Sequence, residues 1–170
     1  MAGTSPAMTT LIASASAIQV EQVSHPLDGA IIDGAHHMQV RVYYEDTDFS
    51  GIVYHANYLR FMERGRTNYL RLLGAAQSEL FAEAESETPG FAFVVRAMQL
   101  DFLKSAKMDD LLDVITRPVE VRGASITMQQ EIRRDELLLL KASVKVAFVS
   151  GGRARPIPVP LRVAMKADVA

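Results

Sequence analysis

The sequence predicts an α+β domain in which one long helix covers a face of an antiparallel sheet. Residues 56–73 carry apolar side chains at steps of three and four, which is the period of an amphipathic helix. Four strand-like segments follow in succession, and their connections are short. A helix followed by a run of strands is typical of the α+β class, because the sheet needs one large element to cover its apolar face.

Composition sets limits on the function. The chain has 170 residues, which suits one domain, and 49% of them are hydrophobic, enough for a sizeable core. A net charge of −2 favours no nucleic-acid partner. The absence of cysteine excludes disulfides, thiolate nucleophiles and cysteine-ligated zinc. No apolar run approaches the roughly 20 residues of a membrane span, so no transmembrane segment is predicted.

The first 36 residues differ from the rest of the chain. They are rich in Ala, Ser, Thr and Gly, and the first charged side chain is that of Glu21. A secretory signal would need a basic region before its apolar core, and none is present. We therefore expect residues 1–36 to form a disordered extension and residues 37–170 to form a single domain. A targeting segment is the alternative interpretation.

The first predicted strand and the long helix frame a polar turn. Residues 38–45 alternate in the manner of a half-buried strand, which ends at Asp, Thr, Ser and Gly residues that favour a turn. The helix over 56–73 is expected to stop at Gly74. Gly65 lies in mid-helix, where it costs about 1 kcal/mol relative to Ala, so we expect a close approach to the sheet there.

The second half of the chain predicts the remaining elements. Residues 75–86 form a shorter helix, and the proline-rich residues 156–160 end the sheet before a short amphipathic tail over 160–167. Neighbouring strands are predicted to pair as antiparallel hairpins, because their connections are short. The four strands are predicted over residues 91–103, 111–122, 125–134 and 138–150.

The densest group of reactive side chains surrounds the turn. Glu45, Asp46 and Asp48 cluster at the strand end, His55 lies just before the helix, and Glu63 lies two turns inside it. Carboxylates and a histidine in proximity are suited to general acid–base chemistry, to nucleophilic attack or to metal binding.

The residues alone leave several interpretations open. Asp46 and Thr47 fit a turn whose side chains bond their own backbone, and Asp48 could have the same role. A metal site would need further ligands placed by the fold, so none is predicted. A triad of Ser50, His55 and Asp48 cannot be judged, because these residues are close in sequence.

A family resemblance changes this balance. Residues 40–71, VRVYYEDTDFSGIVYHANYLRFMERGRTNYLR, resemble the signature of the 4-hydroxybenzoyl-CoA thioesterase family, nearest to its Tol–Pal-associated acyl-CoA thioesterase branch. Residues 91–114 and 122–132 continue the resemblance, which covers about residues 39–164. The pattern Asp-x-Asp-x-x-Gly-(Val/Ile)-(Val/Ile)-x-x-x-x-Tyr is filled by Asp46, Asp48, Gly51, Ile52, Val53 and Tyr58.

The resemblance implies a fold and a mechanism. The fold is the hotdog fold, a curved antiparallel sheet wrapped around one long central helix. The activity is hydrolysis of acyl-CoA thioesters, with Asp48 as nucleophile or general base. Backbone N–H groups at the helix start, near the catalytic His55, would form the oxyanion hole. The substrate-binding residues would be Tyr44, Gly51, Tyr58 and Glu63.

The resemblance also implies partners. No cofactor or metal is expected, and acyl carrier protein is a further potential acyl donor beside acyl-CoA. The chain would form a homodimer or homotetramer with its active site at a subunit boundary, in the cytoplasm, near the Tol–Pal envelope machinery. The CoA phosphates need basic neighbours, for which the unranked candidates are Arg96, Lys104, Lys107, Arg122 and Arg133.

Two other functions are compatible with the same fold. A hotdog dehydratase acting on hydroxyacyl thioesters would pair His55 with Glu63. A non-enzymatic acyl-CoA sensor would not need Asp48. The complete Asp-x-Asp motif favours the thioesterase, although fold alone does not define function.

Overall fold

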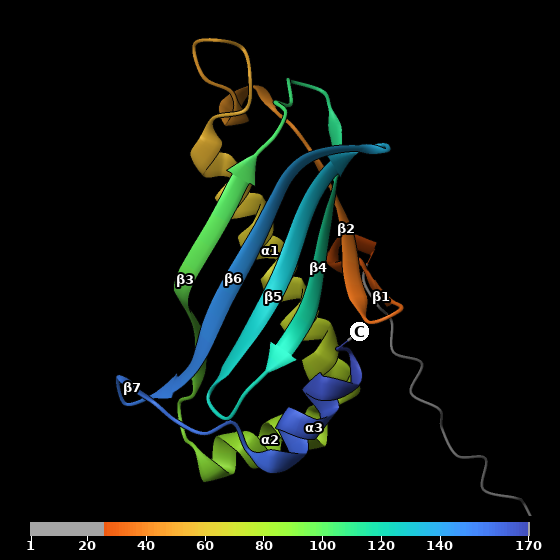
Figure 1. Ribbon diagram of the computed structural model, residues 1–170. Coiled ribbons are helices and arrows are strands. Elements are labelled where there is room, and N and C mark those ends of the chain that lie inside the picture. Colours follow the sequence, from red (N-terminus) through yellow and green to blue (C-terminus); the bar gives the residue numbers. More distant parts are fainter. Residues whose placement is uncertain (1–25, 170) are drawn as a thin grey trace, which may run out of the picture.

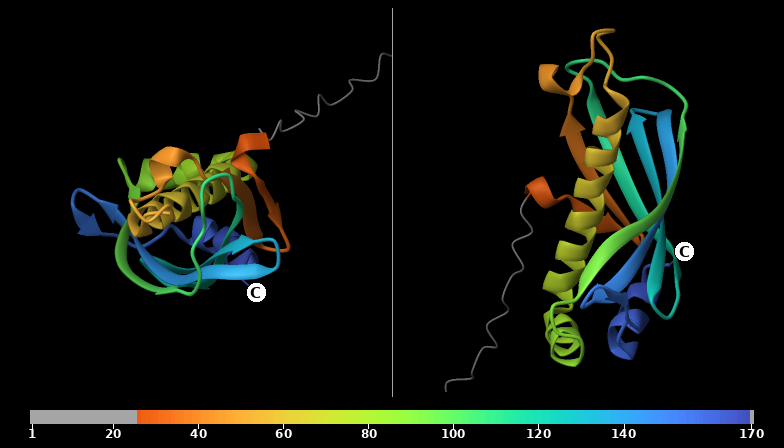
Figure 2. Two further views of the ribbon diagram at one scale, coloured as in Figure 1. Left: turned by 90° about the horizontal axis from the view of Figure 1, so that it is seen from above. Right: turned by 90° about the vertical axis from the view of Figure 1, so that its left-hand side faces the viewer.

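The computed structural model describes residues 26–169, in which an antiparallel sheet curves around one long helix, α1 (Figures 1 and 2). The helix, His55–Ala76, lies along one face of the sheet, and two shorter helices lie together at one end. The predicted α+β class, with a curved sheet wrapped around a central helix, is confirmed.

The sheet has seven strands, and its main path runs in the order β1-β2-β4-β5-β6-β3, with β7 paired to β6. All pairs are antiparallel. The strands are β1 (Ala30–Ile32), β2 (Ala35–Arg41), β3 (Ala92–Phe102), β4 (Leu111–Val121), β5 (Ser125–Arg134), β6 (Leu137–Ser150) and β7 (Arg153–Ala154). The four long strands after α1 therefore have the predicted positions to within one or two residues.

One predicted strand pairing is wrong. We expected β3 and β4 to form a hairpin, but β3 pairs with β6 at the far edge of the sheet. The connection over residues 103–110 crosses the end of the sheet instead (Figure 1). Eight residues can reach about 26 Å, whereas crossing three inter-strand spacings needs only about 14 Å. A short connection therefore did not require a hairpin.

Helix α1 is longer than predicted. It continues through Gly74, so the expected stop at that residue is wrong. Gly74 instead leaves room for the ring of Phe81 on α2 (Ser78–Glu87), which would lie 3.7 Å from a Cβ at this position. The apolar stripe of α1 is buried as its period predicted, with Phe61, Met62 and Tyr69 at most 1% exposed.

The predicted close approach at Gly65 is confirmed. A Cβ there would lie 2.7 Å from Thr116 Oγ1 and 3.1 Å from Val114 Cγ1, both on β4. The helix packs chiefly on β4 and β2 and to a smaller extent on β5. It therefore lies off-centre on the sheet, toward the edge away from β3.

The folded part of the chain begins earlier than residue 37. Residues 26–36 form the short 3-10 helix η1 (Pro26–Asp28), strand β1 and the start of β2. Ala35 and His36 are fully buried, and Arg71 of α1 forms a 2.9 Å ion pair with Asp28. These contacts correct the predicted boundary, whereas residues 1–25 of the predicted extension lie outside the described residues.

The C-terminal helix α3 (Val159–Ala167) packs against the end of β4, as the amphipathic tail predicted, and buries Leu161 and Met165. The Tyr69 hydroxyl of α1 donates a 2.8 Å hydrogen bond to Asp168, just beyond α3. Within residues 26–169, no helix is long and apolar enough to cross a membrane.

Candidate active site

Asp48 lies in a tight turn that leads into α1. Thr47 and Val53 form an antiparallel bridge, and the Asp48 N–H donates to Ile52 O over 2.9 Å. The Gly51 N–H closes the turn by donating to Asp48 O over 2.9 Å. Gly51 has φ +73°, a left-handed conformation that glycine adopts without strain. The motif glycine is therefore explained by the backbone of the turn.

The Asp48 carboxylate is exposed, and only one of its two oxygens accepts a hydrogen bond from the described residues. Its Oδ1 accepts a 2.8 Å hydrogen bond from the Ser50 N–H, two residues further on. Among the described residues, no donor is found for its second oxygen. One oxygen thus fixes the orientation of the carboxylate while the other remains available to a ligand.

Asp46 ties the turn to the helix. Its Oδ2 accepts a 2.9 Å hydrogen bond from the Tyr43 N–H. Its carbonyl accepts the Tyr54 N–H and the Asn57 side-chain amide, both over 2.9 Å. Because Tyr54 and Asn57 flank the first residues of α1, these bonds hold the helix start beside the turn.

The start of α1 presents unpaired donors. Tyr54 is the N-cap residue, and it provides no side-chain cap. Within the described part of the chain, the backbone N–H groups of His55 and Ala56 have no acceptor. Such groups lie at the positive end of the helix dipole, where they can bind developing negative charge.

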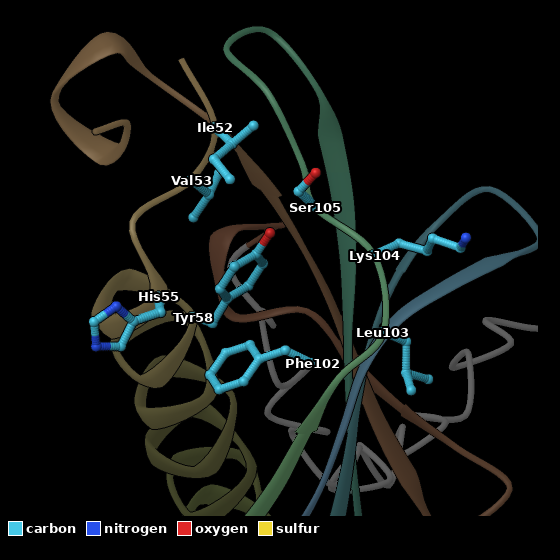
Figure 3. A pocket seen from close by; sticks show the side chains of 8 residues that line it. All are labelled: Ile52, Val53, His55, Tyr58, Phe102, Leu103, Lys104 and Ser105. Carbon is cyan, nitrogen blue, oxygen red and sulfur yellow. The ribbon is translucent and has the colours of Figure 1, made fainter. Parts of the chain in front are cut away.

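A pocket of about 300 Å³ opens between the start of α1 and the segment after β3 (Figure 3). The rings of Tyr58 and Phe102 point into this space, whereas the Lys104 side chain points away from them. The lining is mostly apolar, which suits an acyl group. The full lining is Ile52, Val53, His55, Tyr58, Phe102, Leu103, Lys104 and Ser105.

Tyr58 is buried, and its hydroxyl donates no hydrogen bond to another described residue. Its side chain is 3% exposed, and its hydroxyl oxygen accepts a 2.9 Å hydrogen bond from the Ala106 N–H. Burial raises the pKa of this phenol above its ordinary value. The neutral hydroxyl therefore keeps its own proton to donate.

The His55 ring contacts two aromatic side chains, those of Tyr54 and Phe102. Its exposed ring lies 4.5 Å from the Tyr54 ring and 6.4 Å, edge to face, from the Phe102 ring. No hydrogen bond joins His55 to Asp48 or to Ser50 among the described residues. The histidine side chain is thus positioned by ring contacts at the pocket mouth.

Four of the predicted site residues are absent from the lining of this pocket. Asp48 and Gly51 lie in the turn that precedes the lining residues Ile52 and Val53, whereas Tyr44 and Glu63 lie elsewhere. Tyr44 lies in the 3-10 helix η2 (Tyr44–Asp46), is 82% exposed and is not part of the pocket wall. Glu63 lines a different pocket further along α1. The dehydratase interpretation needs His55 and Glu63 to face one shared cavity. In the structure they line two different pockets.

Sequence reasoning missed the pocket wall that comes from the end of β3. Phe102 and the loop after it reach α1 because this loop crosses the end of the sheet. Lys104, one of five unranked basic candidates, is the one cation in the lining of this pocket. Within residues 26–169, no group of three or more side chains that could hold a metal ion was found.

Comparison with known proteins shows the family. A family model described as the thioesterase superfamily matches residues 50–141. The chain belongs to the thioesterase superfamily. It is 47% identical to the acyl-CoA thioesterase YbgC of Haemophilus influenzae, over 78% of this chain and 94% of that protein. It is 41% identical to the acyl-CoA thioester hydrolase YbgC of Escherichia coli O6:H1, over 71% and 87% respectively.

A crystal structure described as a probable thioesterase from Bartonella henselae shows the same fold. It is 39% identical, covers 73% of this chain and 98% of that one, and superimposes with a TM-score of 0.60. The predicted family and the predicted hotdog fold are both confirmed.

Proposed function

We propose that this chain hydrolyses the thioester bond of acyl-coenzyme A and that Asp48 is its catalytic carboxylate. The similar YbgC proteins are acyl-CoA thioesterases, and the similarity extends over most of their length. The observation that supports the assignment to Asp48 is its turn, which leaves one carboxylate oxygen without a donor among the described residues and leads into the start of α1, where N–H groups are unpaired.

The chemistry follows from these two groups. The free carboxylate oxygen attacks the thioester carbonyl and expels the CoA thiolate, which leaves a mixed anhydride for water to cleave. Alternatively, the carboxylate takes a proton from the water that attacks. Either route places negative charge on the carbonyl oxygen, which the N–H groups of His55 and Ala56 are suited to stabilise.

The pocket beside the helix start would receive the acyl end of the substrate. Phe102 and Val53 provide apolar walls, and the Tyr58 hydroxyl provides a donor. Lys104 extends from the same segment toward the outside, where a CoA phosphate could approach. The role of Lys104 would be electrostatic, because an ammonium group acts on phosphate as a point charge.

The edge strand β3 supports an assembly of two or more copies. Among residues 26–169 its outer edge has no partner strand, and Val94 and Val95 are 43% and 45% exposed. An exposed edge with apolar side chains is a template for pairing with another chain. We infer that a second copy pairs with β3 and completes the wall beside Phe102. Cytoplasmic location and association with the Tol–Pal machinery remain predictions from the family resemblance.

The test is a thiol-release assay with the full-length chain. Straight-chain acyl-CoAs of increasing length and aromatic acyl-CoAs are offered at equal concentration, and free CoA is measured with a thiol reagent. Saturable release above the rate without enzyme is expected for at least one class. If no acyl-CoA or acyl-carrier-protein thioester is hydrolysed, while acyl-CoA still binds, the chain is a sensor rather than an enzyme.

A further inference from the structure

Arg66 is a buried cation without a carboxylate partner. Its residue surface is 8% exposed, and on α1 it lies between the buried Gly65 and the exposed Thr67. Within residues 26–169, no Asp or Glu oxygen lies within 4.0 Å of its guanidinium. Buried charges in proteins are normally paired, because removing an ion from water without compensation is costly. The guanidinium therefore has no carboxylate in direct contact among the described residues, although the Glu63 charge acts on it from a longer distance.

A fixed network orients this guanidinium. Arg66 Nη1 donates a 2.8 Å hydrogen bond to Gln130 Oε1. The amide of Gln130 donates in turn to Met62 O over 2.9 Å and to Thr116 Oγ1 over 2.7 Å. Because both amide donors are occupied, the Gln130 oxygen must face Arg66. Among the described residues, this is the one hydrogen bond found for a guanidinium that has five N–H donors.

Arg66 is one of the residues that line a pocket of about 110 Å³ between α1 and the sheet. The helix contributes Arg66 and Glu63, and the strands contribute the apolar side chains of Phe93, Val95, Met128 and Val146. The Thr67 hydroxyl donates to Glu63. At about 30 Å³ per water molecule, this volume corresponds to roughly four waters, enough for a carboxyl group with a few carbon atoms.

We propose that this pocket is a binding site for a short aliphatic carboxylate. A guanidinium recognises a carboxylate through two parallel N–H···O bonds, and apolar walls favour a hydrocarbon tail over an inorganic anion. Arg66 follows His55 by eleven residues, which is about 16 Å along the helix. The site is therefore separate from the pocket at the helix start, and the proposal concerns binding, whatever the activity of the chain.

The negative charge of Glu63 in the same pocket determines how a charged ligand would bind beside Arg66. Burial lowers the pKa of Arg66, and the Glu63 charge opposes that decrease, so the two charges interact although they form no ion pair. Glu63 is exposed, so water screens its repulsion of an incoming anion. Removing its charge should tighten the binding of a carboxylate, whereas it would weaken the binding of a cation.

The experiment is calorimetric titration of the full-length chain with sodium butyrate at constant ionic strength. Saturable binding is expected for butyrate, with at least tenfold weaker binding for butyramide, the uncharged analogue. Arg66→Lys keeps the charge but loses the planar pair of donors, so affinity should fall at least tenfold. Arg64→Met removes a neighbouring exposed arginine, which lies 5.8 Å from the Phe61 ring centre, and should leave binding unchanged.

Arg66→Lys could lose binding because the variant is less stable, so two further variants test the proposal with Arg66 in place. Val95→Phe fills the pocket without changing its charge and should abolish binding, whereas Glu63→Gln should tighten it. The proposal is overturned if butyrate gives no saturable heat or if butyramide binds equally well. It is also overturned if Val95→Phe binds like the unchanged chain, or if Glu63→Gln weakens the affinity.

Discussion

Asp46 and Asp48 are two residues apart, yet their carboxylates have different surroundings. Asp46 accepts the Tyr43 N–H, and its carbonyl accepts two donors at the start of α1. Asp48 uses one oxygen on Ser50 and keeps the other free. From spacing alone a structural role in the turn was open for both acids, because turn chemistry favours aspartate at both positions. The hydrogen bonds give a physical reason to propose different roles for them.

The first prediction compares these two aspartates. Asp48→Asn keeps the shape of the side chain but removes the charge that would attack or accept a proton. We expect thiol release from acyl-CoA to fall by about 10²–10⁴-fold, the usual contribution of such a group, with an unchanged melting temperature. Asp46→Ala should instead lower the melting temperature, because the Tyr43 N–H loses its acceptor. Near-normal turnover in Asp48→Asn would contradict the assignment.

The second prediction concerns Gly65, where the helix comes closest to the sheet. Ala is the better helix former by about 1 kcal/mol, but overpacking a core usually costs about 1–3 kcal/mol. A Cβ 2.7 Å from Thr116 Oγ1 would also displace a member of the Gln130 network. We therefore expect Gly65→Ala to lower the midpoint of thermal unfolding, measured by circular dichroism.

Gly74→Ala is the matched control for this substitution. It lies in the same helix, and its Cβ would meet the Phe81 ring at 3.7 Å, an ordinary contact distance. The helix propensity gain should therefore dominate, and the midpoint should stay level or increase. Equal decreases in both variants would show that the close approach at Gly65 does not determine the result.

The third prediction concerns His36, which is fully buried on β2. One ring nitrogen, Nε2, lies 2.6 Å from Asp28 O, and the other, Nδ1, has no partner among the described residues. Burial lowers the pKa of His36 below its ordinary value of 6.5, and the charge of His37 acts in the same direction. The carbonyl and the charge of Asp28 oppose these effects.

A lowered histidine pKa means that the unfolded chain binds the proton more readily. The free energy of unfolding should therefore decrease as the pH falls below about 6.5, by at most about 1.4 kcal/mol per pH unit from this group. His36→Gln has no proton to bind and should show a weaker decrease over the same range. The measurement is urea unfolding of both chains between pH 7.5 and pH 5, and parallel curves would contradict the prediction.

At the scale of elements, the periodicity of the sequence predicted the positions of the helix and strands, which depend on local sequence. The long strands and α1 are where alternation and the helical period indicated, because their apolar faces repeat along the chain. The pairing of β3 with β6 could not be predicted in this way, because it depends on where a connection crosses the sheet. Residues 26–36 were missed because their composition resembles the residues before them, and contacts with α1 decide their structure.

The fourth prediction tests the corrected boundary of the domain. A chain that begins at residue 26 is compared with one that begins at residue 37. The shorter chain loses β1, the buried side chains of Ala35 and His36, and the ion pair between Asp28 and Arg71. It also uncovers part of β2 and its neighbours, so we expect a lower melting temperature. Equal melting temperatures would show that residues 26–36 contribute nothing to stability.

At the scale of the whole molecule, the off-centre position of α1 explains where the cavities lie. The helix packs chiefly on β4 and β2, and both the 300 Å³ pocket and the Arg66 pocket lie between α1 and the side of the sheet that carries β3. Asp48, the proposed catalytic residue, could be selected from the sequence because a local motif marks it. The pocket walls could not be, because Phe102 and Lys104 reach the site through a non-local crossing.

The same geometry leaves the candidate active site at an open edge. Phe102, which ends β3, is 50% exposed although it lines the pocket. A second copy paired along β3 would cover it, so activity and assembly should be linked. The last prediction therefore changes the edge strand at Val94, which does not line either pocket.

Val94→Lys places a charge on the exposed edge, which natural edge strands use to prevent pairing. We expect a smaller mass by sedimentation and a lower kcat/KM that partly recovers as the protein concentration is increased, because association restores the wall. Val163→Lys on α3 is the control, since this valine is 61% exposed but lies away from β3. If Val94→Lys keeps the mass of the unchanged chain, pairing does not use this edge. If it is monomeric and fully active at every concentration, one chain suffices for catalysis.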